Sequence, residues 1–143
     1  MKVFIEQSGE ENLKSIFTKD TRVFIKNIFT NLSYPYPYGF IEKTLAPDGD
    51  NLDCYIITDQ KIKSGSIVEC ITIGMVEWVE DGKEDNKVLM ILPGGNFSIG
   101  DEVKQKITYF AEHFFDDVQG KKYTLGKFIG KKEADEYIEK YKI

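Results

Sequence analysis

The run DEVKQKITYFAEHFF, residues 101–115, changes the hydrophobic period of this sequence. Before it, apolar residues gather in short segments that turn-forming residues separate. Within it, the apolar residues recur at three- and four-residue steps, which place them on one stripe of a helix. They are Val103, Ile107, Phe110 and Phe114. The pattern therefore predicts one long helix that begins at Asp101 and ends near Asp116.

The residues before this helix favour β-strands. Segments rich in Val, Ile, Phe and Thr alternate there with turns that contain Gly, Pro or Asp. The predicted strands are Lys2–Glu6, Leu13–Thr18, Arg22–Ile28, Asp53–Ile57, Gly65–Trp78 and Lys87–Leu92.

The residues after the long helix predict a last strand at Lys122–Ile129 and a short closing helix at Glu133–Tyr141. The side chains that this helix would turn inward are Ala134, Tyr137 and Ile138. Strands first and helices last are typical of the α+β class. We expect a small closed β-barrel with one long and one short C-terminal helix packed outside it.

Length and composition favour one compact domain over residues 1–143. Ten Phe, eight Tyr and one Trp, in a sequence that is 41% hydrophobic and 30% charged, supply a core and a solvated exterior. No apolar run approaches the roughly 18 residues that span a bilayer. The N-terminus lacks the basic start and apolar core of a signal peptide, so we expect a cytoplasmic protein.

The net charge of −5 disfavours a general nucleic-acid binder, because such proteins neutralise phosphates with a basic face. An anionic ligand would need converging lysines, or cations held by carboxylates. Cys54 and Cys70 lie in strand-like segments rather than in a spaced ligand motif. We expect buried thiols there, in preference to a disulfide or a metal site.

The segment DGDNLD, residues 48–53, places three carboxylates within six residues. In an extended strand Asp48 and Asp50 would share one face while Asp53 pointed to the other. Convergence therefore needs a turn, which Gly49 makes easy to form. Converged carboxylates repel one another unless they bind a cation or take up a proton.

Carboxylate oxygens favour the hard cations Mg²⁺, Mn²⁺ and Ca²⁺. A solvated acidic turn without a ligand is the alternative. An EF-hand loop does not fit, because Leu52 and Asp53 stand where that loop requires Asp or Asn and then Gly. A second acidic group, EDGKEDNK at residues 80–87, has the character of a solvated hairpin turn when it is considered alone.

Three motifs in this order resemble the signature of the family I soluble inorganic pyrophosphatases. They are YPYPYGF at Tyr34–Phe40, Thr44–Leu45, and the acidic segment at Asp48–Asp53. The resemblance continues through Gly65–Val68, Ile73–Val76, Glu84–Lys87 and Phe110–Phe115, and it covers the chain from Lys2 to the C-terminal helix.

The resemblance implies a five-stranded barrel of OB type with the site at its mouth, and hydrolysis of pyrophosphate to two phosphates. It also implies two or more Mg²⁺ ions, with Mn²⁺ as a substitute, and a homo-oligomer, either a hexamer or a dimer. The implied metal ligands are Asp48, Asp53, Asp85 and a fourth acid from the pair Glu80 and Asp81, of which Glu80 is preferred. Asp50 would accept the proton of a metal-activated water. The implied phosphate-binding residues are Lys14, Lys26, Tyr38 and Lys87, and His113 would contribute to subunit contacts.

Five positions depart from the family pattern. Lys26 stands where the family has Arg, Ile16 and Glu80 stand where it has Glu and Asp, and Phe114–Phe115 replaces a Tyr-Lys pair. An active pyrophosphatase is the leading interpretation. The alternatives are a non-catalytic relative that keeps a metal or phosphate site, and a phosphohydrolase of a larger phosphoanhydride for which the Phe rings would form a wall.

Overall fold

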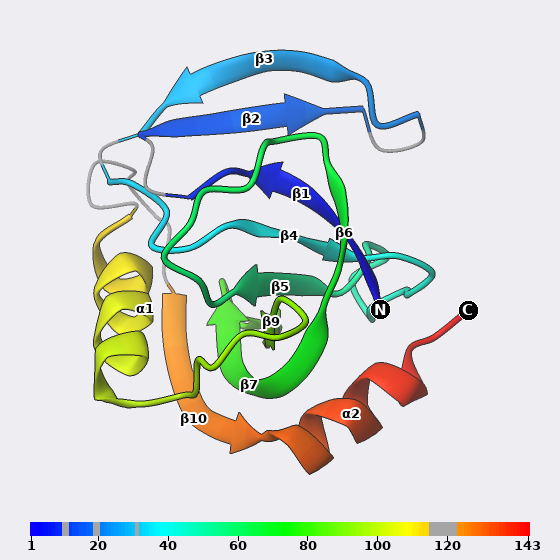
Figure 1. Ribbon diagram of the computed structural model, residues 1–143, viewed down its shortest axis with the longest axis vertical. Helices are drawn as coiled ribbons and strands as arrows, with labels where there is room; N and C mark the ends of the chain where they lie inside the picture. Colours follow the sequence, from blue (N-terminus) through cyan, green and yellow to red (C-terminus); the bar gives the residue numbers. More distant parts are fainter. Residues whose placement is uncertain (10–11, 19–20, 31, 115–122) are drawn as a thin grey trace.

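The computed structural model describes residues 1–9, 12–18, 21–30, 32–114 and 123–143. Within them, a large mixed sheet, a small two-stranded sheet and two helices confirm the α+β class (Figure 1). The large sheet contains β1 (Lys2–Gln7), β4 (Tyr38–Ile41), β5 (Asp53–Ile56), β6 (Ile67–Glu69), β7 (Ile71–Glu80), β8 (Lys83–Glu84), β9 (Lys87–Ile91) and β10 (Tyr123–Gly130). The small sheet pairs β2 (Leu13–Phe17) with β3 (Phe24–Phe29), and the helices are α1 (Asp101–His113) and α2 (Lys131–Lys140).

The large sheet is an open path of strands in the order β10-β7-β9-β5-β4-β1-β6, with β8 paired to β7. A closed barrel needs two neighbours for every strand. In the described part of the chain the end strands β10 and β6 have one neighbour each, so the prediction of a closed five-stranded barrel is not confirmed.

Apart from shifts of one or two residues at strand ends, the strands differ from the prediction at the run Gly65–Trp78, at β4 and at β8. The run Gly65–Trp78 divides into β6 and β7 because its pairing partner changes. Strand β6 pairs with β1, the amide of Cys70 donates to the carbonyl of Met1, and β7 then pairs with β9. The strand β4 was not predicted, since two prolines precede it. Gly39 lets β4 pass close to β1, because a Cβ atom there would lie 1.8 Å from the carbonyl oxygen of Phe4.

Two clusters of buried side chains form the core. One lies between α1 and the sheet, and the predicted stripe of α1 supplies Val103, Ile107, Phe110 and Phe114 to it. The other includes Ile138 of α2. Ala134 and Ile138 are buried as predicted, while Tyr137 is half-buried. The predicted end of the long helix near Asp116 lies outside the described residues.

Both cysteines are free thiols buried in the fold, as the sequence predicts. Helix α1 lies beside β10 at one side of the large sheet (Figure 1). Among the described helices, neither is long and apolar enough to cross a bilayer.

Candidate active site

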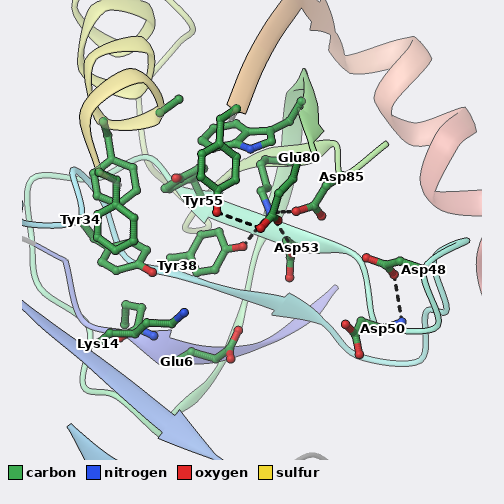
Figure 2. A pocket seen from close by; sticks show the side chains of 17 residues that line it. Glu6, Lys14, Tyr34, Tyr38, Asp48, Asp50, Asp53, Tyr55, Glu80 and Asp85 are labelled. Atoms are coloured by element: carbon green, nitrogen blue, oxygen red, sulfur yellow. Dashed lines mark hydrogen bonds and ion pairs between the residues drawn. The ribbon is translucent and has the colours of Figure 1, made fainter. Parts of the chain in front are cut away.

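A cavity of about 510 Å³ opens where seven strands, α1 and the loop before β5 come together (Figure 2). Its lining residues are Glu6, Gln7, Lys14, Tyr34, Tyr38, Asp48, Asp50, Asp53, Tyr55, Trp78, Glu80, Asp85, Lys87, Phe110, Ala111, Phe114 and Tyr123. Aromatic rings form one part of the lining, and carboxylates and lysines form the rest of it. Such a surface suits a small, highly charged anion together with cations.

The structure brings eight of the nine predicted site residues to this cavity. They are Lys14, Tyr38, Asp48, Asp50, Asp53, Glu80, Asp85 and Lys87. The ninth, Lys26, is exposed on β3 and is not among the residues that line the cavity in the described part of the chain. Of the pair Glu80 and Asp81, Glu80 lines the main cavity, and both line a smaller pocket beside it.

Lys87 is the buried centre of the charged side. Its Nζ donates hydrogen bonds to Asp53 Oδ2 at 2.8 Å, to Asp85 Oδ2 at 2.8 Å and to the hydroxyl of Tyr38 at 2.9 Å. Strands β5 and β9 run parallel with Cys54 opposite Val88, so Asp53 and Lys87 stand side by side at the beginnings of their strands. Burial disfavours the ammonium, but the charges of Asp53 and Asp85 outweigh it and raise the pKa of Lys87.

The acidic segment forms the turn that its glycine predicts. Gly49 has φ +88°, a conformation that glycine adopts without strain, and the amide of Asp50 donates to Asp48 Oδ1 at 3.0 Å. The hydroxyl of Thr44 accepts the amide of Leu52 at 3.0 Å and thereby anchors the end of the turn. As a result Asp48 and Asp50 are exposed at the rim of the cavity, whereas Asp53 is partly buried inside it.

The cavity carries six carboxylates against two ammonium groups. Burial, together with the negative charge of Asp53, raises the pKa of Glu6 to about 7. Burial also raises the pKa of Asp85, an effect that the neighbouring ammonium of Lys87 only partly offsets. This excess of negative charge, presented by hard oxygen atoms, fits divalent cations such as Mg²⁺.

The side chains do not yet converge on one point. No group of three or more His, Cys, Asp or Glu residues is arranged to hold an ion in the segments that the structure describes. The ammonium of Lys87 lies between Asp53 and Asp85 and forms an ion pair with each. The donor set therefore fits a cation in its chemistry, while side-chain movement would be needed to close a coordination shell.

Glu6 and Tyr123 are among the polar residues of the cavity that were not predicted. Glu6 lines the cavity and directly follows the apolar residues Val3, Phe4 and Ile5 of β1. A charged residue directly after an apolar run was the feature of the sequence that could have indicated its place in the site. Tyr123 stands opposite Glu80 in the pairing of β10 with β7, and its hydroxyl donates to Glu80 Oε1 at 3.0 Å. No local pattern marks Tyr123, because strand pairing alone brings it to the cavity.

The aromatic wall contains residues for which the sequence left the role open. Tyr34 is buried, with its ring 4.8 Å from Phe110 and 5.3 Å from Phe114. Phe114 therefore belongs to both the core stripe and the cavity wall, whereas Phe115 lies outside the described residues. On the outer part of α1, His113 stacks on Tyr109 with ring centroids 4.5 Å apart.

Comparison with known proteins agrees with this geometry. Residues 3–142 match the family model described as inorganic pyrophosphatase. The inorganic pyrophosphatase of Geobacillus stearothermophilus is 33% identical over 156 residues, covering 99% of this chain and 93% of the relative. That of Synechocystis sp. is 33% identical over 140 residues, covering 93% and 82%.

Solved structures show the same fold. The structure of the Helicobacter pylori inorganic pyrophosphatase superposes with a TM-score of 0.88 at 25% identity, covering 99% of this chain and 90% of that one. The Coxiella burnetii enzyme gives a TM-score of 0.89 at 24% identity, covering 99% and 92%. The family match spans nearly the whole chain and the predicted carboxylates meet in one cavity, so this chain belongs to the inorganic pyrophosphatase family.

Proposed function

We propose that this protein hydrolyses inorganic pyrophosphate to two phosphates and that it requires a divalent cation, Mg²⁺ or in its place Mn²⁺. The observation that carries the proposal is the meeting of Asp48, Asp50, Asp53 and Asp85 with Lys14 and Lys87 in one cavity. These six residues come from three separate segments of the chain, at residues 14, 48–53 and 85–87. A solvated acidic turn without a ligand would not need residues from other segments in the same cavity.

Four carboxylates are the proposed cation ligands: Asp48, Asp53, Glu80 and Asp85. Bound divalent cations lower the pKa of a coordinated water and neutralise the charge of phosphoryl oxygens. Glu80 is one methylene longer than Asp, and the hydroxyl of Tyr123 restrains it by donating a hydrogen bond. The partial burial of Asp53 and Asp85 limits competition from bulk water.

Asp50 is the proposed general base. The turn around Gly49 holds it at the rim of the cavity, where an attacking water can enter. The water oxygen forms a bond to one phosphorus as the bond from that phosphorus to the bridging oxygen breaks. The bridging oxygen leaves with the electron pair on the second phosphate, and the carboxylate of Asp50 accepts the proton of the water.

Lys14, Lys87 and Tyr38 are the proposed phosphate-binding residues, because they are the donors of the sequence-predicted set that line the cavity. Lys87 already donates to Tyr38, so the two side chains form one group whose hydrogens can turn toward phosphoryl oxygens. We leave Lys26 out of this set because it is not among the residues that line the cavity in the described part of the chain.

The alternatives are not favoured. The relatives at 33% identity are inorganic pyrophosphatases, which disfavours both a non-catalytic module and a phosphohydrolase of larger phosphoanhydrides. We also propose that residues 1–143 act as a single domain, in the cytoplasm and as a homo-oligomer. The family match over residues 3–142 supports the single domain.

A phosphate-release assay tests the function directly. Pyrophosphate with Mg²⁺ should release phosphate, and excess chelator should abolish the release. A nucleoside triphosphate and a linear polyphosphate, each with Mg²⁺, serve as controls for the larger substrates. Undiminished release in chelator, or faster release from either control, would contradict the proposal.

A further inference from the structure

The hairpin of β2 and β3 forms a sheet of its own beside β1, and it carries Lys14 to the cavity (Figure 1). Strand β3 is exposed along its whole length, and β2 is only partly buried. A two-stranded hairpin by itself is marginally stable in water. Its contacts with the large sheet must therefore determine where Lys14 lies.

One of these contacts is next to Lys14. The side chain of Gln7 on β1 accepts the amide of Ser15 at 2.7 Å and donates to the carbonyl of Ser15 at 3.1 Å. This pair of hydrogen bonds holds the backbone of β2 at one point. A strand held at one point can still swing about it, so a second contact is needed to orient the hairpin.

Arg22 provides the second contact, at the turn end of the hairpin. It is the only arginine of the sequence, and its amide donates to the carbonyl of Thr18 at 3.0 Å. Its guanidinium forms an ion pair with Glu42, which directly follows β4. The same group stands over the rings of Phe4 and Phe40, 5.6 Å and 5.1 Å from their centroids.

The ring contacts distinguish this pair from an ordinary surface ion pair, which contributes little. The rings of Phe4 and Phe40 stack on each other with centroids 5.2 Å apart, and Phe17 of β2 meets Phe4 edge-on at 5.1 Å. A planar guanidinium can pair with a carboxylate and stack on an aromatic ring at the same time, which an ammonium does less well.

A second cavity, of about 310 Å³, lies between this contact and the candidate active site. Arg22, Phe17 and Thr18 line it on the hairpin side. Glu6, Asp50 and Asp53 line both this cavity and the main one. The hairpin therefore spans open space between Arg22 and the carboxylates, and few contacts support it there.

We propose that Arg22 is a positioning residue: with Glu42, Phe4 and Phe40 it latches the hairpin onto β1 and β4 and so holds the ammonium of Lys14 in the active site. The inference rests on the proposed function, in which Lys14 binds a phosphoryl group. Arg22 itself acts through the hairpin and does not touch the substrate.

Steady-state kinetics with pyrophosphate and Mg²⁺ provide the first test. Arg22→Ala should raise KM about tenfold, the effect of losing roughly one charge-assisted contact, with little change in kcat. Arg22→Lys should lie between Arg22→Ala and wild type, because it keeps the charge but loses the planar stack. Lys142→Ala serves as a control, because it removes an exposed ion pair with Glu139 near the last residue of the sequence. Its KM and kcat should match those of wild type.

A double-mutant cycle separates positioning from a general structural effect. In the Lys14→Ala background, Arg22→Ala should change KM by less than about twofold, because the side chain that it positions is already absent. If Arg22→Ala raised KM by the same factor with Lys14 present and with Lys14→Ala, the proposal would be overturned.

Hydrogen exchange is the test that does not depend on activity. Peptides covering residues 13–17 and 24–29 should exchange faster in Arg22→Ala, while those of β5 and β9 should be unchanged. Unchanged hairpin exchange would overturn the latch. If the wild-type protein released no phosphate, the proposed function would be wrong. The hydrogen-exchange comparison would then test by itself whether Arg22 holds the hairpin in place. Should Arg22→Ala not fold, Glu42→Gln and Arg22→Lys replace it in every arm.

Discussion

The ammonium nitrogen of Lys87 lies 2.8 Å from Asp53 Oδ2 because β5 and β9 run parallel and start at the same level. The same nitrogen lies 2.8 Å from Asp85 Oδ2, so two carboxylates share a single buried cation. This ion pair joins Asp53 and Lys87, which are 34 positions apart in the sequence.

We predict that Lys87→Met destabilises the cation-free protein by about 3–5 kcal/mol, because two partly buried carboxylates would lose their shared partner. Mg²⁺ should restore part of the loss if it binds the same carboxylates. Urea unfolding in chelator and in Mg²⁺ measures both effects. Lys131→Met, which removes an exposed pair with Asp135, should cost less than about 1 kcal/mol. Equal losses in the two variants would contradict the prediction.

Asp50 and Asp53 should differ in their roles. Asp50→Asn keeps the shape of the side chain but removes the proton acceptor, so kcat should fall by about 10²–10⁴ while the affinity for Mg²⁺ changes little. Asp53→Asn should instead weaken Mg²⁺ binding. Calorimetric titration with Mg²⁺ alone distinguishes them, with the exposed Asp59→Asn as a control. The roles would be reversed if Asp50→Asn lost the cation and Asp53→Asn kept it.

Glu6 should make the cation-free protein less stable at high pH. Its pKa is raised from the ordinary 4.5 to about 7 in the folded state, chiefly by burial. Between these values the folded protein holds a proton that the unfolded chain has released, so stability falls as pH rises through this window. Glu6→Gln should remove this fall and be more stable than wild type by about 1–3 kcal/mol at pH ~8 but not at pH ~4.5.

Urea unfolding in chelator at the two pH values measures this difference. The variant Glu112→Gln, at an exposed position of α1, controls for the general loss of one negative charge. If Glu6→Gln and wild type lost stability in parallel as pH rose, burial of the Glu6 carboxyl would not be the cause.

Tyr123→Phe should weaken the binding of Mg²⁺ by about 3- to 10-fold, because the carboxylate of Glu80 loses a donor that orients it, a net effect of about 1 kcal/mol. The fold should be retained, since the ring still packs edge-on against Trp78. Tyr109→Phe, on the exposed part of α1, should bind Mg²⁺ as wild type does. An unchanged affinity in Tyr123→Phe would show that this hydroxyl does not position Glu80.

Much of the fold follows from local patterns. The stripe from Val103 to Phe114 predicts α1, because a helix repeats every 3.6 residues and its buried face must be apolar. Six short apolar segments likewise mark strands, although the pattern does not show where β6 ends and β7 begins. The strand β4 escaped prediction because Pro35 and Pro37 signal a break just before it.

Local sequence patterns could not predict whether the sheet closes or in which order its strands pair. Both depend on which edges pair, and the pairing energy comes from residues that are distant in the sequence. The predicted closed barrel of five strands and the observed open sheet of eight strands, which runs from β10 to β6, have the same local sequence signals. Those signals therefore do not distinguish the two architectures.

By itself, the sequence determined the acidic turn, because Asp48, Gly49 and Asp50 carry both the turn and its negative charges within three residues. Only the tertiary structure decided that Lys87 pairs with Asp53, that Tyr123 bonds to Glu80, and that Lys26 is not among the residues lining the cavity in the described part of the chain. The reason is physical: a turn is a local conformational preference, whereas a site assembled across paired strands exists only once non-local contacts have set their register.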